Sequence, residues 1–233
     1  MRVVVIIPAL DEERAISRVL DELPAGRVLQ VIVVDNGSTD QTAAVARRHG
    51  ARVITEPFRG YGAACLAGIA AAPACDVIAF MDADYSDFPE ELPRLLAPIE
   101  AGQADLVIGS RMLEPRSRAA LLPQARFGNW LAGALLSRLY GARVSDLGPF
   151  RAIRREALSV LGLDDRRFGW TVQMQARALA RGLAVVEVPV SYRERIGRSK
   201  ISGTMSGTLR AGTAILWTIV REFLAHRPGP GQR

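Results

Sequence analysis

Hydrophobic residues are arranged along the chain in two alternating ways. Short runs rich in Val and Ile, typical of buried strands, lie at 2–7, 31–34, 77–81, 105–109 and 184–190. Elsewhere, apolar residues recur with a helical period, from about Asp11 to Leu23, from about Asp40, from about Pro89 and over 171–182. Because strands that alternate with helices form parallel pairs, the pattern predicts an α/β fold, a mostly parallel sheet with helices on both faces.

Two later segments depart from this alternation. Residues 114–124 show no clear period and contain two prolines, which predicts a mobile loop beside a ligand. Residues 204–226 are amphipathic and helical in pattern, but the uninterrupted apolar stretch, 211–220, is shorter than the roughly 20 residues that span a bilayer. This helix is expected either to lie on a membrane surface or to pack on the domain or in a dimer interface, and the tail 227–233 is expected to be disordered.

The composition is that of a packed globular protein, with 49% hydrophobic and 23% charged residues. A net charge of +6 indicates an anionic partner, such as a membrane surface or a phosphorylated small molecule. Nucleic acid is disfavoured, because no aromatic stacking platform accompanies the scattered basic residues. Cys65 and Cys75 lack CxxC spacing and the N-terminus lacks a signal-peptide pattern, so we expect a cytoplasmic protein with free thiols and no zinc site.

Polar side chains follow the predicted strands at their carboxyl ends. Asp11 and Glu12 follow the first strand, Asp35 the second, and Asp82 and Asp84 the third. In an open parallel sheet, ligands bind at this edge. Carboxylates gathered around one crevice repel each other unless a cation or hydrogen-bond donors compensate them. Asp35 is placed to accept hydrogen bonds from a base or ribose, whereas Asp40 is interpreted as a helix cap.

The segment “MDADYSD” (81–87) carries the sharpest local signal. On a continuing strand Asp82 and Asp84 point the same way, with small Ala83 between them. Such a pair can hold Mg²⁺, which completes its shell with water and diphosphate oxygens. The alternative is that the two carboxylates form a turn or cap a helix. Asp87 is predicted to be structural, as the N-cap of the helix that starts near Pro89.

No glycine-rich phosphate loop is present in the sequence. The segment “RGYGAACLAG” (59–68) has Cys65 where a dinucleotide fingerprint needs its third glycine, and no GxxxxGK[ST] motif occurs. A nucleotidyltransferase is disfavoured, because the first strand is followed by “PALDEERA” and not by a loop with glycine and lysine. Contacts to phosphate are therefore expected from a metal and from basic side chains.

Seven segments occur in a fixed order: “VIIPALDEE”, “VVDNGSTD”, “RGYGAA”, “FMDADYSD”, “VIGSR”, “SDLGPFRAI” and “EVPVSYRERIGRSKISGT”. They resemble the inverting family-2 glycosyltransferases of GT-A fold, in the branch of the dolichyl-phosphate mannose and polyprenyl-phosphate glucose synthases. The resemblance covers nearly the whole chain. It implies an α/β GT-A catalytic domain over 1–203, with a nucleotide-sugar half at about 1–111 and an acceptor half at about 112–203, followed by the helix at 204–226.

The resemblance also implies roles for individual positions. The nucleotide-sugar pocket would contain Pro8, Ala9, Leu10, Glu12, Asp35, Gly62, Asp82, Ala83, Asp84, Arg198 and Lys200. Asp82 and Asp84 look like the DxD pair that holds Mg²⁺ or Mn²⁺. Catalytic roles are implied for Asp84, Asp146, Arg111 and Lys200, and acceptor contacts for Arg126, Arg151, Trp170 and Gln173. Asp146 has a second interpretation, in which it only orients Arg111 or Arg126.

The implied reaction moves a hexose from a UDP- or GDP-sugar to a polyprenyl or dolichyl phosphate, with inversion. Lys200, the only lysine, lies in a loop expected to close over the diphosphate. A phosphate acceptor is already anionic, whereas a hydroxyl acceptor needs a general base. Relatives carry Glu in the segment where this chain has Gln173, which favours a phosphate acceptor.

Two alternatives stay open, the same chemistry on a hydroxyl acceptor and a sugar-nucleotide-binding protein without turnover. Basic residues from Arg193 onward favour peripheral contact with anionic lipid, and a homo-oligomer is compatible with the apolar terminal helix.

Overall fold

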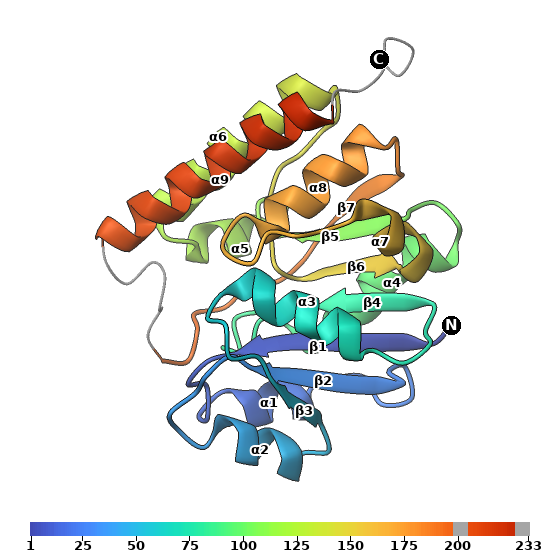
Figure 1. The fold of residues 1–233 in the computed structure, drawn as a ribbon, viewed down its shortest axis with the longest axis vertical. Helices are drawn as coiled ribbons and strands as arrows, with labels where there is room; N and C mark the ends of the chain where they lie inside the picture. Colours follow the sequence, from blue (N-terminus) through green and yellow to red (C-terminus); the bar gives the residue numbers. More distant parts are fainter. Residues whose placement is uncertain (198–204, 227–233) are drawn as a thin grey trace.

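The computed structural model of the chain describes residues 1–197 and 205–226, the segment 205–211 by its backbone alone. Seven strands form one sheet in the order β3-β2-β1-β4-β6-β5-β7 (Figure 1). The strands are β1 (Val3–Ala9), β2 (Gln30–Asp35), β3 (Arg52–Thr55), β4 (Val77–Phe80), β5 (Leu106–Ser110), β6 (Arg151–Arg154) and β7 (Val185–Pro189). Only β6 is antiparallel to its neighbours, so the prediction of a mostly parallel sheet is confirmed.

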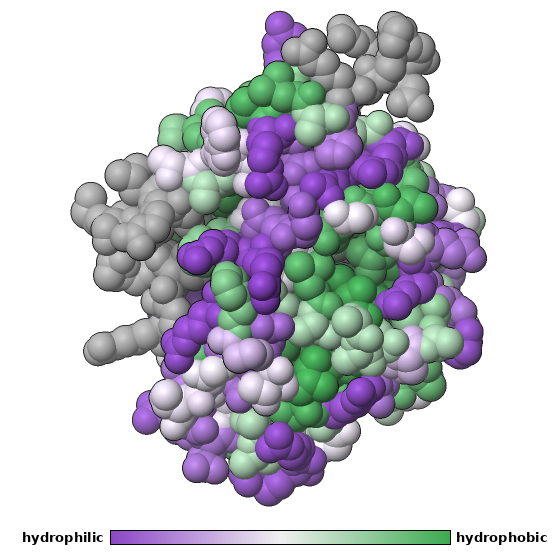
Figure 2. All heavy atoms as spheres, viewed as in Figure 1, coloured by the Kyte–Doolittle hydropathy of each residue, from purple (hydrophilic) through white to green (hydrophobic). Residues whose placement is uncertain are grey.

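Helices cover both faces of the sheet, as the alternating pattern predicted. Strand β1 shows why, because Val3, Val5 and Ile7 face one layer while Val4 and Ile6 face the other. The first layer contains α1 (Ile16–Asp21), α2 (Thr42–Arg48) and α4 (Leu92–Glu100), which follows a 3₁₀ turn at Pro89–Glu91. The second contains α3 (Tyr61–Ala71), α7 (Arg155–Leu161) and α8 (Trp170–Ala180). On this face, hydrophobic residues gather over α3 and toward α7 (Figure 2).

The prediction of a loop at 114–124 is wrong. These residues form α5 (Pro115–Ala120) and the start of α6 (Pro123–Tyr140). Both prolines stand at the first position of a helix, where a missing N–H costs nothing. Glu114 caps α5 by accepting the backbone N–H of Ser117 at 2.6 Å. The prolines therefore mark two helix starts, not an irregular segment.

The terminal helix α9 (Met205–Ala225) packs on α6 and α8. Figure 1 shows α6 and α9 side by side, on the outer side of α8. Ile219 is fully buried in a cluster with Leu136 and Val172, while Glu222 forms an ion pair with Arg177 at 2.7 Å. Of the two expectations for this helix, the structure shows packing on the domain. Within the described parts of the chain, no helix has both the length and the hydropathy of a membrane span.

Candidate active site

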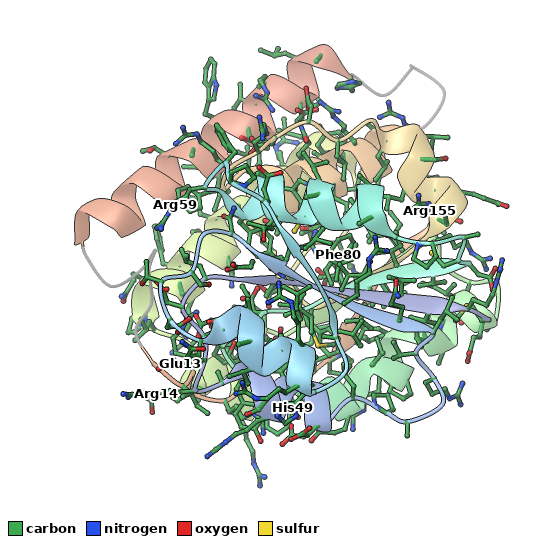
Figure 3. All side chains as sticks on the ribbon, turned by 60° about the horizontal axis from the view of Figure 1, so that its bottom comes forward. Glu13, Arg14, His49, Arg59, Phe80 and Arg155 are labelled. Atoms are coloured by element: carbon green, nitrogen blue, oxygen red, sulfur yellow. The ribbon has the colours of Figure 1, made fainter. Side chains whose placement is uncertain are left out.

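The carboxyl ends of β1, β2 and β4 meet at one edge of the sheet. Ala9 is paired with Asp35 across β1 and β2, and Ile6 with Phe80 across β1 and β4. Pro8 and Leu10 are partly exposed at this edge, while Ala9 is buried. Figure 3 shows Glu13, Arg14 and Arg59 in the loops at this edge, with Arg155 at the opposite end of the sheet. The strand order thus places Pro8, Ala9, Leu10 and Asp35, which were predicted for the nucleotide pocket, at one edge of the sheet.

Hydrogen bonds join the loop after β1 to the loop after β2. Asp11 has a positive φ of 51°, which ends the strand, and its Oδ1 accepts the backbone N–H of Thr39 at 2.7 Å. The N–H of Glu12 donates to Thr42 Oγ1 at 2.7 Å. Helix α1 begins at Ile16, later than predicted. Asp40 accepts the N–H of Thr42 at 2.9 Å, but the N-cap of α2 is Gln41, so Asp40 closes the turn before the helix and is not the predicted cap.

Asp35 is half-buried, and only its Oδ1 has a hydrogen bond within the described residues, from the N–H of Ser38 at 2.9 Å. This geometry agrees with a carboxylate available to a base or ribose, and that role stays a prediction.

Three carboxylates lie together just after β4. Asp82 is half-buried, whereas Asp84 and Asp87 are 4% and 2% exposed. Asp84 Oδ1 accepts the N–H of Ser86 at 2.9 Å, and Asp87 Oδ2 accepts the N–H of Asp82 at 3.1 Å. Asp87 is therefore structural as predicted, but not as a helix cap, because it folds back onto the Asp82 backbone. Its Oδ1 is buried without a hydrogen-bond partner among the described residues.

The carboxylates of this cluster need a nearby cation to remain charged. Burial raises the pKa of Asp82 well above its usual value, and the negative charges of Asp84 and Asp87 raise it further. The pKa of Asp87 rises to about 6, again chiefly because of burial. Acids in this arrangement are stabilised in their charged form by a nearby cation.

A strap, residues 191–197, crosses this cluster after β7 and supplies one such cation. The Arg195 guanidinium forms an ion pair with Asp84 Oδ2 at 2.8 Å, and the N–H of Ile196 donates to the Asp84 carbonyl at 3.0 Å. Arg193 fixes the strap, since its guanidinium lies 3.3 Å from the Tyr85 ring centroid and donates to Glu22 at 2.6 Å.

The sequence did not predict that Arg193 and Arg195 belong to the site, because both were interpreted only as basic residues facing lipid. The signal available was their position, directly after a strand whose carboxyl end meets the site.

Arg111 and Asp146 form a second charged unit beside the strap. The Arg111 Nε and terminal nitrogen donate to the two Asp146 oxygens, each at 2.8 Å, and the Arg111 backbone N–H adds a third bond at 2.9 Å. Asp146 is fully buried. The second interpretation of Asp146 is thus the observed geometry, since both oxygens hold Arg111 and neither is free for a substrate proton.

Two residues predicted to touch the acceptor, Arg151 and Trp170, are core residues. Arg151 is fully buried and donates to the backbone carbonyls of Leu147, Gly148 and Thr171. Trp170 is fully buried, with its ring centroid 4.8 Å from that of Phe80. These side chains hold the sheet and α8 together, so the structure offers them no contact with an acceptor.

Gln173 and Gly62 are also structural. The fully buried Gln173 Nε2 donates to Glu222 at 2.8 Å, and its Oε1 accepts the N–H of Asp165 at 2.9 Å. A Cβ on Gly62 would lie 2.1 Å from the Asp165 carbonyl, so this glycine serves the packing of α3 and not the nucleotide. An amide at 173 therefore satisfies a buried network and is no sign of lost activity.

The remaining predicted residues differ in placement. Arg126 is exposed on α6, where it lines a shallow groove with Arg118, Phe127 and Trp130, so acceptor contact stays a prediction for it. Arg198 and Lys200 lie outside the described residues.

Residues 4–162, more than half of the chain, match the family described as glycosyl transferase family 2. The chain belongs to this family. Family 2 membership agrees with the geometry, because the acidic cluster lies at the sheet edge where this fold binds ligands. The protein is therefore a glycosyltransferase, and the predicted GT-A-like α/β fold is confirmed.

Proteins named as glycosyltransferases or mannosyltransferases resemble the chain over most of their lengths. It is 43% identical to an uncharacterized glycosyltransferase of Mycobacterium tuberculosis over 90% of this chain and 94% of that protein. It is 35% identical to an undecaprenyl-phosphate mannosyltransferase of Micrococcus luteus, covering 96% and 99% of the two chains.

The structure of glucosyl-3-phosphoglycerate synthase from M. tuberculosis, with Mn²⁺, UDP-glucose and phosphoglyceric acid, has a TM-score of 0.75 and 26% identity, covering 95% of this chain and 79% of that chain.

Proposed function

We propose that this family 2 enzyme transfers a hexose from a UDP- or GDP-sugar to a polyprenyl-phosphate-type acceptor, in a metal-dependent reaction with inversion. The observation that carries the proposal is the juxtaposition of Asp82, Asp84 and Asp87 with two arginines, Arg111 and Arg195, at the carboxyl edge of the sheet. Carboxylates suit a divalent cation, and guanidinium groups suit phosphate oxygens.

The residues present fit a divalent metal. Asp87 Oδ1 is a buried acceptor without a partner in the described structure, and burial together with the charges of Asp84 and Asp87 raises the pKa of Asp82. Asp82 and Asp84 would hold the ion, and water and diphosphate oxygens would complete its shell. Among the described residues, no group of three or more His, Cys, Asp or Glu is arranged to hold a metal by itself. Bound there, Mg²⁺ or Mn²⁺ would neutralise charge on the departing diphosphate.

The arginines would then act on the phosphates. Arg111 is held rigidly by Asp146, so its outer surface presents a fixed positive charge beside the acidic cluster. Arg195 is 30% exposed and can turn from Asp84 toward a phosphate once a metal neutralises that carboxylate. These side chains supply positioning and charge stabilisation for the transfer.

The described site favours an acceptor that needs no general base. Asp146 is fully engaged with Arg111, and Gln173 lies in a buried network, so neither is available to remove a proton. A phosphate monoester attacks as an anion near neutral pH. The similarity to an enzyme named as an undecaprenyl-phosphate mannosyltransferase supports the same acceptor class.

Calorimetric titration tests both substrates. The protein should bind UDP or GDP with higher affinity when Mn²⁺ is present, and the nucleotide-loaded protein should bind a short-chain prenyl phosphate. The same titration with 3-phosphoglycerate is the comparison, because a solved structural neighbour contains phosphoglyceric acid. Binding of 3-phosphoglycerate without binding of the prenyl phosphate would replace the lipid acceptor with a soluble one. A nucleotide affinity that does not change with Mn²⁺ would contradict the proposed metal dependence.

Arg195 competes with a metal for Asp84, so its removal should strengthen metal binding. For Arg195→Gln we expect Mn²⁺ alone to bind about two- to fivefold tighter, since a partly exposed ion pair contributes up to about 1 kcal/mol. The readout is free Mn²⁺ measured by electron paramagnetic resonance. Arg27→Gln, which breaks an exposed pair with Glu100, is the matched control and should change nothing. Equal or weaker Mn²⁺ binding in Arg195→Gln would show that the pair does not oppose the metal.

A further inference from the structure

The N-terminal part of α6 exposes large aromatic side chains. Phe127 and Trp130 are 61% and 60% exposed, and their ring centroids lie 5.8 Å apart. Leu122, just before the helix, is 52% exposed. Water contact with adjacent aromatic and aliphatic side chains is unfavourable, so such a cluster marks a surface that another apolar phase covers.

Positive charge surrounds this cluster. We define the α5–α6 surface as Met112, Arg118, Leu122, Arg126, Phe127 and Trp130, most of which line a groove of about 350 Å³. Between 112 and 130 the sequence has three arginines, Arg116, Arg118 and Arg126, and a single acid, Glu114, which is occupied in capping α5. In the part of the chain that the structure describes, no carboxylate pairs with Arg118 or Arg126. Aromatic rings with unpaired arginines are complementary to anionic lipid headgroups.

The surface adjoins the candidate active site. Met112 directly follows Arg111, whose guanidinium lies 5.3 Å from the Tyr192 ring centroid on the strap. In Figure 1, α5 and the first turns of α6 lie on the side of the molecule toward which β1 and β2 point. An acceptor phosphate held in a membrane surface would therefore reach the site from the α5–α6 surface.

The outer side of α9 is the competing surface, and from Gly212 to His226, where its side chains are described, its arginine is already paired. Trp217 is 66% exposed there, with Val220 and Leu224 on the same side of the helix. Its neighbouring Arg221 is already paired with Glu222 at 3.0 Å and with Asp165 at 3.9 Å. The apolar side chains of α9 thus have no unpaired described arginine beside them, in contrast to those of α6.

We infer that the α5–α6 surface docks on an anionic lipid bilayer, with Phe127 and Trp130 inserted at the headgroup level and Arg118 and Arg126 on lipid phosphates. Bilayer docking extends the proposed function, since it explains how a lipid acceptor meets Arg111, but it can be measured without any transfer. The partner is a membrane surface, not a single bound lipid.

Co-sedimentation with vesicles of phosphatidylcholine containing 30% phosphatidylglycerol (about the anionic content of a charged membrane) tests the inference. Phe127→Ser with Trp130→Ser should lower the partition coefficient about tenfold or more. Arg118→Gln and Arg126→Gln should each lower it about fivefold on these vesicles, and not on pure phosphatidylcholine. Trp217→Ser is the matched control, an equally exposed tryptophan on α9, and should bind as the unmodified chain does.

Tryptophan fluorescence gives a second readout that does not depend on the folding of a double variant. The chain has three tryptophans, of which Trp170 is fully buried, so in Trp217→Phe the only exposed reporter is Trp130. We expect a blue shift with anionic vesicles and quenching by brominated lipid. A signal unchanged by vesicles, or binding that is lost in Trp217→Ser and kept in the double variant, would overturn the inference, as would a dimer in solution that depends on Trp130.

A separate measurement distinguishes this inference from the proposed function. Transfer to a water-soluble, short-chain prenyl phosphate without vesicles should persist in Phe127→Ser with Trp130→Ser. Vesicle binding without transfer by the unmodified chain would refute the proposed acceptor and leave the docking surface in place, whereas transfer without vesicle binding would refute the docking surface alone.

Discussion

Asp84→Asn is expected to reduce metal-dependent sugar transfer about a hundred- to thousandfold, the cost of losing one well-placed electrostatic group. The amide keeps the size of the side chain and can still accept the N–H of Ser86, so the loop should keep its shape. It lacks the charge that a divalent cation needs. The measurement is initial rate against Mn²⁺ concentration, with Mn²⁺ affinity determined in parallel.

Asp76→Asn is the control for that variant. Asp76 is an exposed acid that pairs with Arg2 at 3.4 Å, at the opposite end of β4 from the acidic cluster. Its replacement should leave rate and metal affinity unchanged. If Asp84→Asn had normal turnover and normal Mn²⁺ affinity, the assignment of the metal to this cluster would be wrong.

Glu222→Ala is expected to lower the free energy of unfolding by about 3–5 kcal/mol, the usual cost of removing one partner of a buried ion pair. The Glu222 side chain is 2% exposed and Arg177 10%, and the alanine would leave Arg177 and the Gln173 amide without that partner. Urea unfolding measures the change. Glu100→Ala, which breaks an exposed pair with Arg27, should cost less than about 1 kcal/mol. Equal losses in the two variants would mean that α9 is not held by this network.

The Glu222 carboxylate also makes the free energy of unfolding depend on pH, in a direction that follows from its pKa. Burial alone would raise the pKa of Glu222, but hydrogen bonds from Arg177, Gln173 and Arg221 outweigh it and lower the pKa to about 2. Because the folded pKa is depressed from its ordinary value of 4.5, the stabilisation is complete above about pH 4.5 and is lost as pH falls toward 2. The difference in stability between the unmodified chain and Glu222→Ala should therefore shrink across this window in acid unfolding curves.

The fold was largely predictable because strand runs such as 31–34 and 77–81 are buried on both sides. Sequence reasoning missed β3 and β6. The edge strand β3 is short and half exposed, and β6 begins and ends with arginine, as “RAIR”. Neither shows a continuous apolar run, and the antiparallel pairing of β6 depends on its neighbours β4 and β5, not on its own composition.

For the site, the residues at strand ends were predictable, since strand order places Asp35 and Asp82 at one edge. What the sequence could not show was which polar side chains turn inward. Gln173 and Arg151 carry polar groups in motif-like segments, yet their partners come from α9 and from backbone carbonyls, which only the tertiary structure brings near. Arg195 was missed because its ion-pair partner, Asp84, lies far away in the sequence and is brought near only by the tertiary structure.

The central claim is metal-dependent sugar transfer to a lipid phosphate at this edge of the sheet. The most direct measurement incubates the protein with UDP- and GDP-hexoses and a panel of acceptors, a polyprenyl phosphate, 3-phosphoglycerate and simple alcohols, with Mn²⁺ or with a chelator, and identifies products by mass spectrometry. The account predicts a hexosyl-phosphoprenol that forms with Mn²⁺ and disappears with the chelator. Transfer only to alcohols or to 3-phosphoglycerate, or equal transfer in the chelator, would contradict it.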